Sequence, residues 1–179
     1  MTIGNLTAID VTVDVLRNAE LVFDHCLEKI SHCLNQLADE QVWWRPHEEQ
    51  NSIGNLLLHL TGNVQQWIVA GLGSVTDVRD RPSEFSTRGP ISSDELQKDL
   101  RKTVEQAKNI LHSASPESMA KTYRIQGFEV SGWCALFDCI PHFKGHTQEI
   151  ICLTRMQLRQ NYQFHWQPQT PEQGAPVDP

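Results

Sequence analysis

Hydrophobic residues recur three and four positions apart along four stretches of the chain, and polar or irregular segments separate these stretches. Because a helix turns by about 100° per residue, this spacing places the apolar side chains on one helical face. We therefore predict helices over about residues 14–38, from residue 51 or 52 to about 72, from residue 92 or 93 to about 112, and over about residues 133–158. Four amphipathic helices of this length predict an all-α fold, a four-helix bundle.

The segments between the predicted helices are of two kinds. Residues 71–90 read GLGSVTDVRDRPSEFSTRGP, with no periodicity, so we expect a long crossover connection between the second and third helices. Residues 121–132, KTYRIQGFEVSG, alternate around a glycine and predict a short extended or hairpin segment. We expect one domain over residues 1–166 and a Pro- and Gln-rich, poorly ordered tail over residues 167–179.

Composition narrows the classes of function. The net charge is −7 and the sequence has no long basic run, which argues against a nucleic-acid-binding face. No stretch approaches eighteen uninterrupted apolar residues, so we predict no membrane span. The N-terminus has no basic region typical of a secretory signal. Five cysteines without a CxxC pair indicate reduced thiols and a cytoplasmic protein.

The fourth predicted helix carries polar residues in the middle of its inward face. Apolar residues close both ends of this face, at Ala135 and at Leu153. Burying polar groups without partners costs several kcal/mol, so those between them must satisfy one another or bind something. The polar positions of the face are Asp138, Cys139, His142, His146 and Glu149.

Three histidines are candidate metal ligands. His142 and His146 lie four residues apart, and two imidazoles at this spacing on a helix can bind one metal ion. His59 lies beside the apolar seam of the second predicted helix, where an isolated histidine is more often a core-edge residue bonded to a carbonyl group. Together with a pair on a facing helix, however, it predicts a three-histidine site with an open position, as in catalytic metal centres.

Glu149 and Asp138 are the candidate catalytic residues, as proton-transfer groups beside the metal. For each, the alternative is a carboxylate that accepts the second N–H of a ligand histidine, and Glu149 is also a candidate fourth ligand. Cys139 is more typical of packing than of metal ligation. Pro141 lacks an amide N–H and is expected to bend the helix next to His142.

NSIGNLLLHLTGNVQQWI, preceded by VWWRP, together with PHFKGHTQEI, resembles the DinB/YfiT-like superfamily of metal-binding four-helix bundles. The resemblance covers roughly residues 15–158 and is densest at 42–69, 79–85 (RDRPSEF) and 142–151. In that superfamily one histidine of the second helix and two of an HxxxH motif on the fourth bind a divalent metal, which implies His59, His142 and His146 here. Glu149 stands where many relatives carry a neutral amide.

Known members of the superfamily include thiol-S-transferases that use low-molecular-weight thiols and a maleylpyruvate isomerase. The resemblance therefore implies a metal-dependent enzyme that activates a thiol or water toward a small-molecule substrate, by transferase or hydrolase chemistry. Imidazole ligands suit several first-row metals, of which we expect zinc or nickel. It also implies a homodimer. The alternatives are a non-catalytic metal- or ligand-binding homodimeric bundle, and a fold in which the histidines are only satisfied core residues.

Three further polar residues accompany the candidate site. Asn63 lies four residues after His59 and is expected near the site or bonded to a neighbouring backbone. Arg79 and Arg81 lie in the long connection. We expect them either to meet an anionic substrate or thiol, or to serve on the surface or as loop caps.

Overall fold

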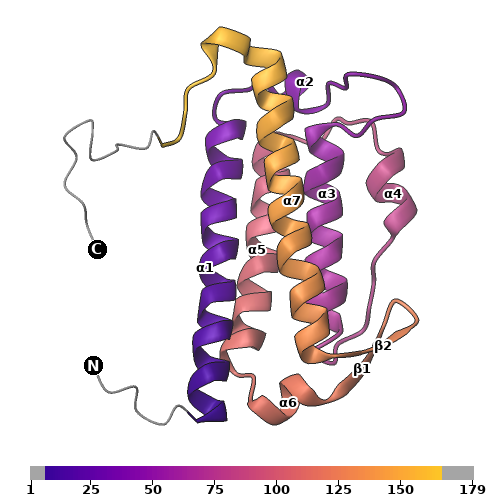
Figure 1. Ribbon diagram of the computed structural model, residues 1–179. Coiled ribbons are helices and arrows are strands. Elements are labelled where there is room, and N and C mark those ends of the chain that lie inside the picture. Colours follow the sequence, from indigo (N-terminus) through magenta and orange to yellow (C-terminus); the bar gives the residue numbers. More distant parts are fainter. Residues whose placement is uncertain (1–6, 167–179) are drawn as a thin grey trace, which may run out of the picture.

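The computed structural model describes residues 7–166 and consists mainly of four long helices that lie side by side (Figure 1). Their bounds are α1 Ala8–Leu34, α3 Ile53–Val64, α5 Ser93–His112 and α7 Gly132–Leu158, and α3 continues as a π-helical segment, η1, Gln65–Ala70. The predicted helical bundle is therefore confirmed. The predicted tail, residues 167–179, lies outside the described residues.

The first helix differs most from its predicted bounds, because it begins at Ala8 rather than near residue 14 and ends at Leu34 rather than residue 38. Its start is fixed by a capping box in which the Thr7 hydroxyl accepts from the Asp10 amide and the Asp10 carboxylate accepts from the Thr7 amide. Such a cap satisfies amide groups that the first helical turn leaves without partners. Local hydrogen bonding rather than apolar spacing therefore sets this boundary.

Short elements join the long helices: α2 Asp39–Val42, α4 Arg81–Ser86, α6 Pro116–Ala120 and the 3₁₀ turn η2 Arg159–Asn161. Strands β1 Thr122–Ile125 and β2 Phe128–Ser131 pair antiparallel, with Ile125 opposite Phe128. Gln126 and Gly127 both have positive φ, 53° and 86°, as a two-residue hairpin turn requires. The extended segment predicted for residues 121–132 is thus a hairpin.

The connection between α3 and α5 returns along the length of α3 (Figure 1). Near the end of α3, the Gln66 amide donates to Asp77, whereas at its beginning the Asn55 amide donates to the carbonyl group of Thr87. The first amide of α5, at Ser93, then donates to Asp39 in α2. These contacts confirm the crossover. They also position the middle of the connection beside the middle of α3.

The helix α4 interrupts a segment in which the sequence predicts no helix. Its N-cap is Asp80, whose carboxylate accepts from the Ser83 amide, and Pro82 lies in its first turn, where the missing N–H is harmless. Six residues are too few to display a periodic apolar face. The local pattern that marks α4 is therefore its cap rather than apolar spacing.

All four long helices contribute to one hydrophobic core. Phe23 of α1 and Phe143 of α7 are fully buried and meet edge to face, with ring centroids 5.0 Å apart. Cys26 and Cys33 are buried in this core, and all five cysteines are free thiols. Within residues 7–166 none of the helices is sufficiently long and apolar to cross a membrane.

Candidate metal centre

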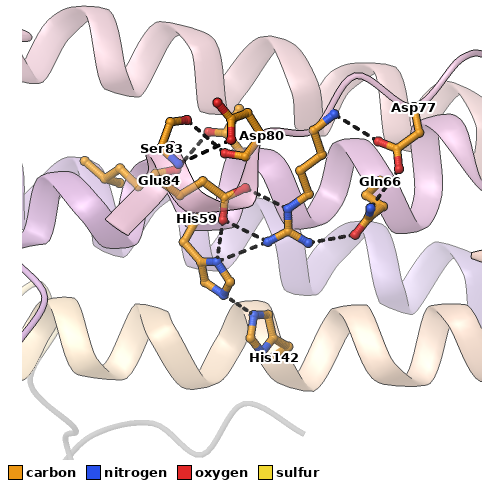
Figure 2. Close-up of polar contacts among 10 residues, drawn as sticks. His59, Gln66, Asp77, Asp80, Ser83, Glu84 and His142 are labelled. Atoms are coloured by element: carbon orange, nitrogen blue, oxygen red, sulfur yellow. Dashed lines mark hydrogen bonds and ion pairs between the residues drawn. The ribbon is translucent and has the colours of Figure 1, made fainter. Parts of the chain in front are cut away.

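Three histidines from two helices converge at one point of the bundle. His59 comes from α3, and His142 and His146 come from α7 (Figure 2 shows the first two facing each other). The Nε2 atoms of His59 and His142 are 2.9 Å apart, and one nitrogen from each of the three rings lies within 4.8 Å of the others. Nitrogen atoms this close need only small shifts to share an ion at about 2.0–2.1 Å. The cluster is thus consistent with metal binding.

A buried carboxylate fixes the orientation of the His59 ring. Glu84, in α4, has its Oε2 atom 2.8 Å from Nδ1 of His59, and both side chains are less than 10% exposed (Figure 2). Nδ1 of His59 contacts both the Glu84 carboxylate, at 2.8 Å, and the Arg79 Nη2 atom, at 3.2 Å. Because a carboxylate only accepts hydrogen bonds, the shorter contact assigns the proton to Nδ1, and Nε2 then keeps its lone pair toward the other two histidines. Metal-binding histidines commonly have such a carboxylate partner.

Gly62 provides the space for this carboxylate. A Cβ atom at position 62 would lie 2.0 Å from Oε1 of Glu84 and 2.9 Å from its Cδ atom, which is far inside van der Waals contact. Gly62 lies almost one helical turn after His59 on α3, so its missing side chain lets α4 approach the ligand histidine. The sequence NLLLHLTGN therefore encodes both a ligand and the space for the partner of that ligand.

Arg79 holds Glu84 in turn. Its guanidinium donates to both carboxylate oxygens, at 2.6 and 2.9 Å, and its side chain is only 2% exposed. It also donates to Gln66, whose amide is held by Asp77 (Figure 2). Arg79 is thus part of a buried network around the site rather than a surface cap, and it also lines the cavity beside the histidines.

The second pair of a histidine and a carboxylate, His146 and Glu149, is more exposed than the first. Oε2 of Glu149 lies 2.8 Å from Nδ1 of His146, one turn along α7, with exposed fractions of 44% and 24% for the two side chains. This contact leaves Nε2 of His146 for the cluster. Of the readings open for Glu149, the geometry matches the carboxylate that orients a ligand histidine.

Asp138 and Cys139 are neighbours with different surroundings. Asp138 is exposed and lies on the wall of a cavity that also includes His59 and His142, while its carboxylate accepts a weak bond from the Cys134 thiol at 3.7 Å. Cys139 is 1% exposed, and burial raises the pKa of its thiol to about 12. It is therefore a packing residue, as favoured from the sequence, and a thiolate ligand would be costly there.

Burial keeps two of the imidazoles neutral. It lowers the pKa of His142 to about 4, and the neighbouring His146 and His59 lower it further through repulsion. The pKa of His59 is also lowered by burial, although the hydrogen bond that Glu84 accepts from its ring opposes this effect. Since a metal ion binds the neutral ring, both groups are ready for a metal at neutral pH.

Pro141 does not interrupt the helix that carries the pair, because α7 runs continuously from Gly132 to Leu158. Pro141 lines an apolar groove between α1 and α7, together with Ala19, Val22 and Phe137. This groove has a volume of about 390 Å³. The smaller cavity beside the histidines has a volume of about 290 Å³.

Sequence reasoning missed Glu84, the partner of His59. Neither apolar spacing nor the distance of 25 residues in the chain connects these two positions. Two signals were present: the Asp80–Pro82–Ser83 cap, which predicts a helix start, and the dense resemblance over residues 79–85. Either one indicates an ordered element where the lack of periodicity predicts only a loop.

Comparison with known proteins agrees with this architecture. The structure is similar to the crystal structure of a DinB-like protein from Bacillus cereus ATCC 10987, with a TM-score of 0.65 and 15% sequence identity over 81% of this chain and 92% of that chain. No curated protein matches the sequence. The fold is therefore a DinB-like helical bundle with a three-histidine cluster.

A family model matches residues 10–169, which is most of the chain. The protein belongs to this family, described as "Protein of unknown function (DUF1572)". The resemblance to DinB-like bundles is confirmed by the fold, and the chemistry of the site has to be argued from its own residues.

Proposed function

We propose that this protein is a divalent-metal-dependent enzyme that activates a thiol or water toward a small-molecule substrate, by transferase or hydrolase chemistry. The observation that carries the proposal is the convergence of three imidazoles. In two of them a carboxylate contacts Nδ1, which leaves Nε2 free to bind a metal ion. This donor set suits zinc or nickel. Held by three neutral ligands, such an ion lowers the pKa of a coordinated water or thiol toward neutrality.

The residues around the cluster support an open site rather than a closed, structural one. Glu149 is engaged with the outer nitrogen of His146, and Cys139 is packed in the core with a raised pKa. Neither is therefore a good fourth ligand. The cavity meets the cluster at His59 and His142, which leaves room for a substrate on that side.

Asp138 is the proton acceptor in this proposal. It is an exposed carboxylate on the wall of the cavity, and it lies one helical turn before His142 on α7. From this position it would take the proton of the thiol or water and return it to the leaving group. Glu149, the other candidate, acts through His146 and positions that ring.

The test of the metal site is the metal content of the purified protein and of His146→Ala. We expect about one zinc or nickel ion per chain in the wild type and a loss of most of it in the variant, because two histidines remain. His25→Ala is the matched control, since His25 is an exposed histidine of α1. Equal metal content in His146→Ala and the wild type would contradict the proposal.

The runner-up is a non-catalytic, metal-binding homodimer. The apolar groove between α1 and α7, with Phe137 63% exposed at its edge, is the observation that favours self-association. Turnover separates the two functions: the metal-loaded protein is incubated with a low-molecular-weight thiol and an electrophilic probe. Asp138→Asn is expected to lower the rate while metal content stays the same. A mass measurement on the same sample reports the dimer.

A further inference from the structure

Asn63 is a buried polar side chain that the fold itself does not satisfy. It lies one turn after His59 on α3 and is 8% exposed, and its Oδ1 atom has no hydrogen-bond partner among residues 7–166. The side chain nevertheless lines the cavity beside the histidines. Leaving a buried acceptor unpaired costs free energy, so such groups in native proteins call for an explanation.

Asn55, two turns earlier on the same helix, shows what a structural asparagine looks like in this protein. Its amide nitrogen donates to the carbonyl groups of Glu84 and Thr87 at 2.8 and 3.0 Å, and its oxygen accepts from Arg45 at 2.6 Å. Asn55 therefore ties the connection to α3. Asn63 is also buried, at 8% exposed against 0% for Asn55, but its side-chain oxygen has no such partner among the described residues, and its side chain lines the cavity.

Arg81 lines the same cavity, whose wall also carries the Asp138 carboxylate, and it forms no ion pair among the described residues. Arg79, two residues earlier, is neutralised by Glu84, whereas Arg81 has no acidic group within 4.0 Å in the described part of the chain. Its guanidinium lies over the ring of Phe85, 5.1 Å from the centroid, and Phe85 packs against His59. The stacking holds the planar Arg81 guanidinium at the cavity, where its N–H groups can donate two parallel hydrogen bonds to a carboxylate.

We propose that this cavity recognises a small ligand that carries both a carboxylate and an amide, with the carboxylate on Arg81 and the amide on Asn63. Rotation of the Asn63 side-chain amide exchanges its oxygen and nitrogen. A ligand amide, which both donates and accepts, suits either orientation. Trp67, on the cavity wall, covers the apolar part of the ligand. The ligand class deepens the proposed function and rests on it: the molecule is an acylated amino acid whose thiol reaches the histidine cluster.

The test uses the cobalt-loaded protein and the absorption band that appears when a thiol binds the metal. N-Acetyl-L-cysteine carries thiol, amide and carboxylate. N-Acetyl-L-cysteinamide lacks only the carboxylate, and 3-mercaptopropionate lacks only the amide. We expect N-acetyl-L-cysteine to bind about tenfold more tightly than either analogue, because each buried polar contact is worth about that factor.

Variants assign the two preferences to their residues. Arg81→Gln is expected to remove the preference for N-acetyl-L-cysteine over N-acetyl-L-cysteinamide. Asn63→Leu is expected to remove the preference for N-acetyl-L-cysteine over 3-mercaptopropionate. Both keep the metal content of the wild type. Arg124→Gln, an exposed arginine of β1, is the control and leaves both preferences intact.

Thermal unfolding separates recognition from a structural role of Asn63. Because its oxygen has no partner in the fold, Asn63→Leu is expected to keep or raise the Tm while it weakens N-acetyl-L-cysteine binding. A lower Tm with unchanged binding preferences would overturn the assignment of Asn63.

The test also distinguishes failure of this inference from failure of the proposed function. Equal binding of the three thiols would overturn the recognition site and leave metal-dependent thiol activation standing. If none of the thiols produces the absorption band, thiol activation is wrong, and the recognition site is tested with N-acetyl-L-alanine. On the zinc-loaded protein this compound is expected to shift the Asn63 side-chain amide signal in an NMR spectrum, and Arg81→Gln is expected to abolish the shift. No shift would overturn the recognition site as well.

Discussion

The two carboxylate–histidine pairs of the site have the same length and different surroundings. Both Glu84–His59 and Glu149–His146 measure 2.8 Å from oxygen to Nδ1. The first pair is almost completely buried and is part of a network with Arg79, whereas Glu149 is 44% exposed. Water competes for and screens an exposed pair, so equal distances do not imply equal contributions.

The comparison indicates that the α3 side and the α7 side of the site hold their histidines in place by different means. On the α3 side, burial and the network fix a single orientation of His59. On the α7 side, His142 and His146 belong to one helix, so the backbone itself sets their spacing and Glu149 only refines it. The α3 side should therefore be the more sensitive to mutation, for stability as well as for metal affinity.

The largest effect is expected for Glu84→Ala. Removing this carboxylate leaves the Arg79 guanidinium, 2% exposed, without its acidic partner, and breaking a buried pair in this way costs about 3–5 kcal/mol. The His59 ring also loses its anchor, which lowers metal affinity by about 10- to 100-fold. Urea unfolding and a competitive zinc titration measure the two effects.

A double variant, Glu84→Leu with Arg79→Met, separates these effects. It removes both charges, so it should recover much of the stability but not the metal affinity. If Glu84→Ala has the same free energy of unfolding as the wild type, the buried network does not stabilise the α3 side. The proposed difference between the α3 and α7 sides would then be wrong.

The next effect concerns a glycine on each side of the site. Gly62→Ala introduces a Cβ atom 2.0 Å from the Glu84 oxygen, so the carboxylate must move from His59 and metal affinity should fall by about tenfold. Gly145→Ala, next to His146 on α7, is the control, because a Cβ there meets nothing within 4 Å. Because alanine favours a helix more than glycine does, Gly145→Ala should raise the free energy of unfolding by up to about 1 kcal/mol.

Zinc titration and thermal unfolding of both variants provide the measurement. Similar zinc affinities for Gly62→Ala and Gly145→Ala would mean that the position of Glu84 does not matter for the metal.

The same contrast explains which parts of the structure could be predicted from the sequence. The long helices α3, α5 and α7 and the His142–His146 pair follow from local spacing, because each lies within one periodic element. His59 could be added because its helix is periodic too. Glu84 and Arg79 could not, since their contact with His59 depends on the path of a connection that crosses back along α3, and local patterns carry no information about that path.

The pH dependence of the metal-free protein tests whether His142 is buried in its neutral form. Its pKa is about 4 in the folded protein and about 6.5 in an unfolded chain, so the unfolded state takes up the proton first as the pH falls. Stability is therefore lost between about pH 6.5 and 4. Allowing for the partial exposure of the ring, we expect this histidine to account for about 1–2 kcal/mol between pH 7 and 5.

Other groups titrate in the same range, so the measurement is the difference between the wild type and His142→Gln in urea unfolding with a chelator present. A constant difference across this pH range would show that the His142 ring is solvated rather than buried.

The smallest effect is expected for Glu149→Gln. The amide oxygen of glutamine still accepts the N–H of His146, and an exposed ion pair contributes at most about 1 kcal/mol. Metal affinity should fall by less than about fivefold, and the difference should shrink further at high salt, because screening weakens exposed pairs most. The decisive comparison is Glu84→Gln under the same conditions, where the lost charge leaves Arg79 buried with a neutral partner and salt should have little influence. If the two variants lose the same affinity with the same salt dependence, burial does not distinguish the two sides of the site, and the orientation of His59 must come from α3 alone.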